Sequence, residues 1–166
     1  MALDCVMETF TRRRTGSNAD DLERMWTWKR KPLRLGTWNV RSLYRPGYAR
    51  TLVEEIMRYR MDITALQEIR WTGEGNCTIN GYKIIYSARN DGMHRDGVGF
   101  CVNQRVYNAI ESFNPIDERL LHLRINCKLF KLSLVVAFAP TEDEEDDRKD
   151  EFYDKLRKGD RRNLQT

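Results

Sequence analysis

The sequence of 166 residues is poor in cysteine and proline and has no long apolar run. Its four cysteines form no CxxC pair, which excludes a zinc knuckle and indicates reduced thiols rather than a disulfide framework. No segment approaches the stretch of about 18 apolar residues that crosses a bilayer, and the N-terminus lacks the pattern of a secretory signal. These absences predict a soluble, intracellular, single-domain protein that does not bind membranes.

Several motifs of common enzymes are also missing. The chain has no P-loop, GxGxxG or GxSxG sequence, which excludes the usual nucleotide-binding and serine-hydrolase sites. His94 lies in the polar loop NDGMHRDG and His122 in an expected strand, and neither has an identifiable nucleophile as a partner. The acidic run EDEEDD (142–147) lacks the glycine and final glutamate of an EF-hand, and is interpreted as a helix start.

The expected domain occupies residues 32–158. Residues 1–31 contain a basic triplet among Gly, Ser, Asn and Asp and show no apolar period, which predicts a flexible leader. Residues 33–40 predict a strand, residues 48–60 a helix with one apolar face, and residues 62–68 a second strand. A strand, a helix and a strand in such close succession indicate a βαβ unit with two parallel neighbouring strands.

The remainder predicts a mixed α/β sheet that two helices cover incompletely. Further strands and a last helix are expected over 82–88, 97–102, 106–113, 119–127, 128–139 and 144–158. Asn80-Gly81 and Asn114-Pro115 predict turns between strands, and the last two strands nearly abut, as in a tight antiparallel hairpin. The run LSLVVAFA alternates poorly, which indicates strands that are buried on both faces. The chain is therefore expected to be part of a larger sandwich, with an exposed apolar sheet face that favours self-association.

Two polar residues stand where ligands of α/β sheets gather. Asn39 ends the first strand and Glu68 the second, and neighbouring strands lie about 4.8 Å apart. An amide and a carboxylate at adjacent strand ends can converge on one small ligand, and a carboxylate there suits Mg²⁺. Alternatively, Asn39 caps a turn and Glu68 is simply solvated. The spacing alone favours this second interpretation.

Five short motifs occur in a fixed order: TWNV (37–40), ALQEIRW (65–71), GVGF (97–100), ERL (118–120) and FAPT (138–141). This ordered set resembles the endonuclease/exonuclease/phosphatase superfamily. It is similar in particular to the craniofacial development protein 2-like proteins, and these look like the AP-endonuclease-type domains of RTE-clade retrotransposons. The resemblance runs from about Leu33 to Leu156, so residues 159–166 are interpreted as an unmatched tail.

The resemblance implies a fold, an activity and a site. The chain would be the N-terminal half of a four-layer α/β sandwich that cleaves DNA with Mg²⁺, or with Mn²⁺ in its place. Asn39 would help hold the phosphate and the metal-bound network, and Glu68 would bind the ion. Arg119 and Thr141 would contact the phosphate or orient loops. The resemblance favours a nuclear over a cytoplasmic location.

The chain departs from the family pattern at three points. Phe138 replaces the tyrosine of the usual YAPT motif, and the sequence contains neither the GDFN-type nor the SDH-type motif. Those motifs would supply the groups that activate water, so this chain by itself is expected to be catalytically inactive. The alternative is a non-catalytic protein that binds nucleic acid or chromatin, which the net charge of +4 permits without identifying the partner.

Overall fold

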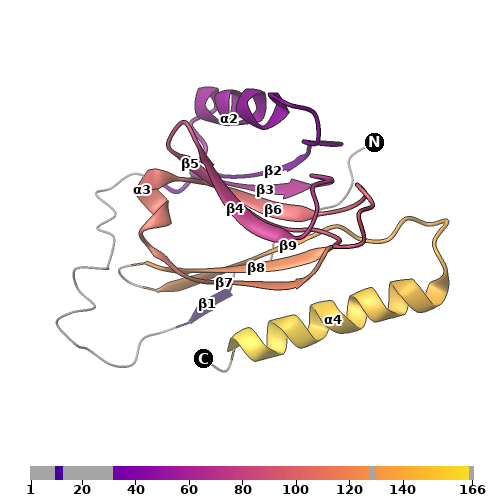
Figure 1. Ribbon diagram of the computed structural model, residues 1–166. Coiled ribbons are helices and arrows are strands. Elements are labelled where there is room, and N and C mark those ends of the chain that lie inside the picture. Colours follow the sequence, from indigo (N-terminus) through magenta and orange to yellow (C-terminus); the bar gives the residue numbers. More distant parts are fainter. Residues whose placement is uncertain (1–9, 13–31, 128–129, 165–166) are drawn as a thin grey trace.

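The computed structural model describes residues 10–12, 32–127 and 130–164, whose strands form two sheets (Figure 1). The five-stranded sheet has the order β2-β3-β6-β5-β4 and the four-stranded sheet the order β1-β9-β8-β7. The strands of the first sheet are β2 (Leu35–Asn39), β3 (Ile63–Gln67), β4 (Glu74–Ile79), β5 (Tyr82–Ser87) and β6 (Val98–Asn103). Those of the second are β1 (Phe10–Arg12), β7 (Ile110–Asp117), β8 (Leu120–Asn126) and β9 (Lys131–Ala137). The helices are α2 (Tyr48–Arg58), α3 (Gln104–Tyr107) and α4 (Asp146–Leu164).

The predicted βαβ unit is confirmed. Strands β2 and β3 are parallel neighbours, paired from Leu35 with Ile63 to Asn39 with Gln67, and α2 lies between them in the sequence. Helix α2 begins after Gly47, whose φ of 89° is a left-handed conformation that glycine adopts without strain. Because the two strands run in the same direction, both end at the same edge of the sheet.

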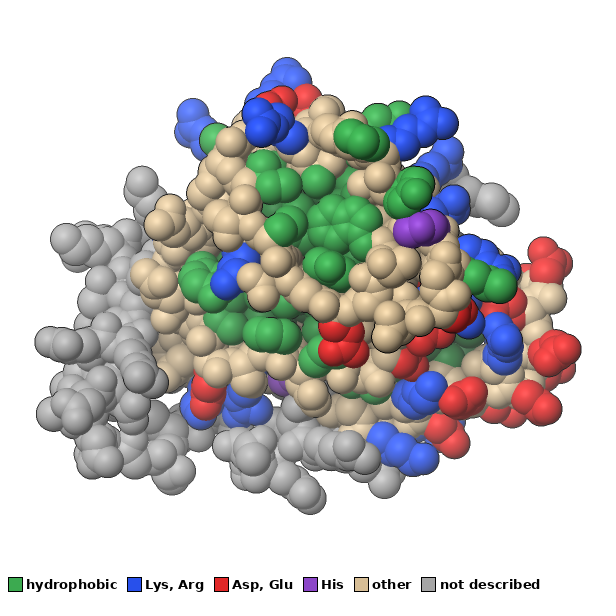
Figure 2. Space-filling view, in the orientation of Figure 1, with side chains coloured by type: hydrophobic (Ala, Val, Ile, Leu, Met, Phe, Trp, Pro, Cys, Tyr) green, Lys and Arg blue, Asp and Glu red, His purple; other side chains and the backbone are tan. Residues whose placement is uncertain are grey.

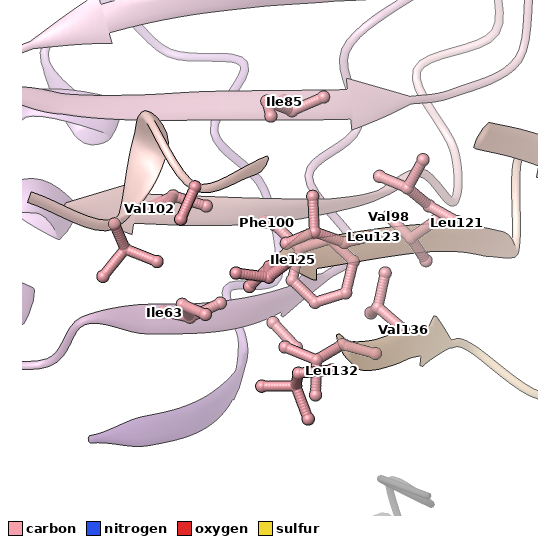
Figure 3. Packing of buried hydrophobic residues seen from close by; sticks show 14 of the residues in the cluster. Ile63, Ile85, Val98, Phe100, Val102, Leu121, Leu123, Ile125, Leu132 and Val136 are labelled. Carbon is pink, nitrogen blue, oxygen red and sulfur yellow. The ribbon is translucent and has the colours of Figure 1, made fainter. Parts of the chain in front are cut away.

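The two sheets pack face to face through the main hydrophobic core (Figure 3). The five-stranded sheet contributes Ile63, Ala65, Ile85, Val98, Phe100 and Val102. The four-stranded sheet contributes Leu121, Leu123, Ile125, Leu132, Leu134 and Val136. All these side chains are at most 7% exposed, so the inter-sheet contact supplies most of the apolar burial of the fold.

Helix α2 covers the opposite face of the five-stranded sheet. Its residues Leu52, Val53 and Ile56 pack on a second core that includes Leu66 and Ile84. The helix covers this face only in part: Figure 2 shows hydrophobic side chains exposed below it. The partly buried side chains that pack on the second core include Trp71, Cys77, Ile79 and Tyr86.

Helix α4 runs along the outer side of the four-stranded sheet (Figure 1). Its Phe152 is 5% exposed, and Lys155 Nζ lies 3.1 Å from Asp117 Oδ2 at the end of β7. In Figure 1 the order is therefore helix, sheet, sheet, helix. No helix among the described residues is long and apolar enough to cross a bilayer.

The expected burial of strand 128–139 on both faces was wrong. In β9, Leu132, Leu134 and Val136 are buried, whereas the residues between them are only partly buried. The two faces differ because one packs into the inter-sheet core and the other faces outward. Its predicted tight hairpin with β8 is confirmed by the antiparallel pairing of Asn126 with Lys131.

The expectation of a strand over residues 106–113 was wrong at its start. Residues 104–107 form the short helix α3, because the Asn103 side chain accepts a hydrogen bond from the Arg105 backbone N–H. Strand β7 then runs through Pro115, where a turn was expected. The proline is tolerated because β7 is an edge strand with register shifts on both sides of its centre.

Strand β4 was not predicted, because EGNCTI contains few strand-forming residues. It pairs with β5 through the predicted turn at Asn80 and Gly81, whose φ angles of 49° and 78° suit a tight hairpin. A long-range partner, rather than local propensity, thus makes this segment a strand.

The two ends of the chain differ from the expected boundaries where they are described. Residues 10–12, within the expected leader, form β1 and pair antiparallel with β9. The rest of residues 1–31 lies outside the described residues. Helix α4 continues to Leu164, so it crosses the expected boundary between the domain and the tail at residue 158.

Candidate metal and phosphate site

Backbone hydrogen bonds join three loops at the edge where β2 and β3 end. The Val40 N–H donates to Gln67 O at 3.0 Å, and the Leu43 N–H donates to Ile69 O at 2.9 Å. The Ile69 N–H in turn donates to Gly97 O at 3.1 Å, which attaches the loop before β6. These bonds hold the side chains of the three loops in a fixed relation to one another.

Unusual backbone conformations are concentrated in the same loops. Arg41, Glu68 and Arg70 each have a φ of 55°, and Asp96 has a φ of 59°. Such left-handed conformations strain residues other than glycine, and they persist where surrounding contacts hold them. At Gly97, φ is 92° and an added Cβ would lie 2.8 Å from Ile69 Cγ1. The loops are thus packed too closely for a side chain at that position.

The structure brings Asn39 and Glu68 together. Asn39 Nδ2 donates a hydrogen bond to Glu68 Oε1 at 2.8 Å, and Arg70 Nη2 lies 2.8 Å from Glu68 Oε2. The Arg41 backbone N–H donates to Asn39 Oδ1 at 3.1 Å, which fixes the direction of the amide. The convergence expected from the parallel strand ends is therefore present, while the catalytic and metal-binding roles of these residues stay predictions.

These neighbours set the charge of Glu68. Partial burial by itself raises the pKa of its carboxyl group. The hydrogen bonds from Asn39 and Arg70, with the positive charges of Arg70 and Arg41, outweigh that effect and lower the pKa below its usual value. Glu68 is therefore a carboxylate near neutral pH, which is the form that binds a cation.

The donor set at Glu68 fits a magnesium ion that keeps most of its water. Among the described residues, no group of three or more His, Cys, Asp and Glu side chains is placed to hold a metal. A single carboxylate is enough for Mg²⁺ when water and substrate phosphate complete the shell. A carboxylate offers about four lone-pair positions, so the two present hydrogen bonds leave room for a metal ligand.

Arg119 lies in an ion-pair network and not at the carboxylate of Glu68. Its side chain is 13% exposed, and its Nη2 lies 2.8 Å from Glu144 Oε1 and 3.3 Å from Asp96 Oδ1. Its Nη1 donates to Phe138 O at 3.3 Å. Of the two roles expected for Arg119, these contacts favour the orientation of loops, because two carboxylates already hold the guanidinium.

Thr141 and Phe138 lie close to this network. Thr141 is exposed, and its hydrogen bonds are made by its backbone: its N–H donates to Glu144 Oε1 over a long 3.5 Å, and its oxygen accepts from the Glu144 N–H at 3.1 Å. The ring of Phe138 packs against the inter-sheet core, with Arg119 Cζ 5.3 Å from its centroid. Phe138 thus contributes apolar contact where the family pattern has a hydroxyl.

Sequence reasoning missed several residues of this edge. Arg70 was not singled out, and neither were Asp96 and Glu144, which bind Arg119. Arg89 was not singled out either; its side chain lies 2.7 Å from Asp91 and 3.5 Å from Glu118. The local signals were the position of Arg70, two residues after Glu68, and that of Asp91, two residues after Arg89. The other contacts join segments that are far apart in the sequence.

The structure contains a parallel βαβ unit that ends in an amide and a carboxylate, and this unit packs on a core between two sheets. This is the arrangement expected from the resemblance. The model of the endonuclease/exonuclease/phosphatase family matches residues 36–166, and the chain belongs to this family. The α/β fold class is thereby confirmed. That the chain forms the N-terminal half of a four-layer sandwich stays a prediction.

Within the family, the chain is similar to two curated proteins named craniofacial development protein 2. The protein from Tragulus javanicus is 37% identical over 122 residues, which are 74% of this chain and 21% of the relative. The protein from Bos taurus is 35% identical over 122 residues, which are 74% of this chain and 20% of the relative. The chain thus spans about a fifth of the length of the curated relatives it matches.

Proposed function

We propose that this chain carries the metal-binding part of a DNA phosphodiesterase and does not turn over substrate by itself. The observation that supports the proposal is the 2.8 Å hydrogen bond between Asn39 Nδ2 and Glu68 Oε1 at two parallel strand ends. Family membership supports a nuclease-like or phosphodiesterase-like chemistry. The resemblance to RTE-type domains adds a retroelement origin, a DNA substrate and a nuclear place of action to the proposal.

Each residue of the site has a distinct task in this proposal. The Glu68 carboxylate binds Mg²⁺ or Mn²⁺, and Asn39 holds that carboxylate in place through its amide N–H. Arg70 keeps the carboxylate ionised and places a positive charge where the substrate phosphate arrives. When bound, the metal ion acts as a Lewis acid on the scissile phosphate.

The proposed inactivity rests on the surroundings of Glu68. Its hydrogen-bonding partners are an amide and a guanidinium, and neither accepts a proton from water near neutral pH. The ring of His94 contacts the backbone oxygen of Arg70 at 3.1 Å rather than the carboxylate. Loss of general-base catalysis lowers the rate by roughly 10²–10⁴-fold.

A non-catalytic nucleic-acid-binding function is the second candidate. It is favoured by exposed arginines beside the site, among them Arg41, Arg45 and Arg95. Arginine side chains neutralise phosphates and make binding dependent on salt. This function would use the same edge of the sheet without requiring a metal ion at Glu68.

A metal-binding titration and a plasmid-nicking assay test the proposal together. Mn²⁺ binding is measured by electron paramagnetic resonance for the wild type, Glu68→Gln and the control Glu74→Gln, which changes an exposed glutamate on β4. We expect binding to be lost only in Glu68→Gln, and we expect no nicking of supercoiled DNA by the wild type. Equal Mn²⁺ binding in all three proteins would contradict the metal site. Nicking that needs Glu68 and stops with EDTA would contradict the proposed inactivity.

A further inference from the structure

An aromatic pair is exposed beside the Asn39–Glu68 site. The ring centroids of Tyr44 and His94 lie 4.0 Å apart, with an angle of 44° between the ring planes. Tyr44 is nevertheless 59% exposed, so most of its side chain remains accessible to a ligand. The two residues come from different loops, Tyr44 from the one after β2 and His94 from the one before β6. The pair is therefore a feature of the surface and not part of a core.

Hydrogen bonds tie the aromatic pair to the site. His94 Nδ1 lies 3.1 Å from the backbone oxygen of Arg70, whose guanidinium contacts Glu68. On the other loop, the Tyr44 backbone N–H donates to Ser42 Oγ at 3.1 Å. The His94 ring thus contacts the backbone of the same residue whose side chain binds Glu68.

The surroundings of the pair combine apolar and positive groups. Exposed Met93 and Arg95 flank His94, and exposed Arg45 follows Tyr44. Flat aromatic rings among arginines match a ligand that carries flat bases on a phosphate backbone.

We propose that Tyr44 and His94 form a stacking site for an unpaired base of a DNA strand whose neighbouring phosphate lies at Glu68. This inference rests on the proposed function for its substrate, and it adds a preference for single-stranded or unpaired DNA. A base in an intact duplex has its faces covered by its neighbours and is less available for stacking on a protein ring. The exposed arginines bind the phosphates on either side of that base.

The test measures stacking without cleavage. A single-stranded oligonucleotide that contains 2-aminopurine is titrated with protein in EDTA, and both fluorescence quenching and anisotropy are recorded. The variants are Tyr44→Ala, Tyr44→Phe and the control Tyr59→Ala, which removes a tyrosine that is 60% exposed just after α2. Thermal unfolding of each variant verifies that it is folded.

We expect Tyr44→Ala to bind the strand about tenfold more weakly and to lose most of the quenching, because one base loses its stacking partner. Tyr44→Phe and Tyr59→Ala are expected to behave as the wild type. A blunt duplex is expected to bind less tightly than the single strand, and to be insensitive to Tyr44→Ala. Wild-type quenching in Tyr44→Ala, or an equal loss in Tyr59→Ala, would overturn the inference.

One further variant separates this inference from the proposed function. Glu68→Gln is expected to keep the quenching in EDTA, because stacking needs no metal ion. If Glu68→Gln binds Mn²⁺ as the wild type does while Tyr44→Ala loses quenching, the metal site is refuted and the stacking site stands. If Mn²⁺ binding needs Glu68 but quenching is independent of Tyr44, the stacking site is refuted and the metal site stands.

Discussion

Replacement of Asn39 by alanine tests how the site holds its carboxylate. The change deletes the 2.8 Å hydrogen bond from Asn39 Nδ2 to Glu68 Oε1, together with the exposed 3.1 Å bond that Asn39 Oδ1 accepts from the Arg41 N–H. Hydrogen bonds to charged groups contribute roughly 1.5–3 kcal/mol, and the Glu68 side chain is 19% exposed, which favours the lower end. We therefore expect Asn39→Ala to lower the free energy of unfolding by about 1.5 kcal/mol near neutral pH.

The expected loss depends on pH in a definite direction. In the folded protein the pKa of Glu68 is lowered, with the bond from Asn39 as one cause that acts against burial. Stability from a depressed carboxyl pKa is present above the unfolded pKa of about 4.3 and is lost as the pH falls through the folded pKa. The difference in unfolding free energy between wild type and Asn39→Ala should therefore become smaller in acid, where the part that depends on the Glu68 charge is lost.

Urea unfolding in EDTA at about pH 7 and about pH 3 measures both effects. The matched control is Asn76→Ala, which removes an exposed asparagine on β4 and should change stability by less than about 0.5 kcal/mol. The reasoning is refuted if Asn39→Ala lowers the free energy of unfolding equally at both pH values. It is also refuted if Asn39→Ala lowers this free energy no more than Asn76→Ala does at neutral pH.

Two further predictions concern packing around the site and in the four-stranded sheet. Gly97→Ala should lower stability by about 1–3 kcal/mol in thermal unfolding, because its Cβ would lie 2.8 Å from Ile69 Cγ1 at a φ of 92°. Gly92→Ala shares a positive φ of 74° but meets open space, so an equal loss there would contradict the steric argument. His122→Leu should stabilise the fold by about 1 kcal/mol, because it removes a buried Nε2 that has no hydrogen-bond partner among the described residues. Burial, and then the charge of Arg124, lower the pKa of His122 in the folded protein. The gain in stability from His122→Leu should therefore increase as the pH falls below about 6.5, where the unfolded wild type takes up a proton. A gain in stability that is independent of pH would contradict this.

Local pattern was sufficient for the βαβ unit, whereas the family resemblance was needed to favour the meeting of Asn39 and Glu68 over a turn cap and a solvated carboxylate. An alternating strand, a helix with one apolar face and a short apolar strand follow one another within residues 33–68. Parallel strands in such a unit end at the same edge, so their last side chains can converge there. The ordered motifs in the sequence likewise identified the family, which the match over residues 36–166 shows.

Tertiary structure decided the features that depend on distant partners. Strand β4 exists because β5 pairs with it, and Pro115 is accommodated because β7 lies at a sheet edge. Neither condition is visible in the segment itself.

The surroundings of the site were decided in the same way. Arg119 was expected to contact the phosphate or to orient loops, and Asp96 and Glu144 approach it from two other loops and hold its guanidinium. Tyr44 and His94, 50 positions apart in the chain, meet at 4.0 Å. The sequence by itself thus determined the family, the first fold unit and the central carboxylate. Only the packing of separate loops determined which side chains surround that carboxylate, because those contacts depend on the whole chain.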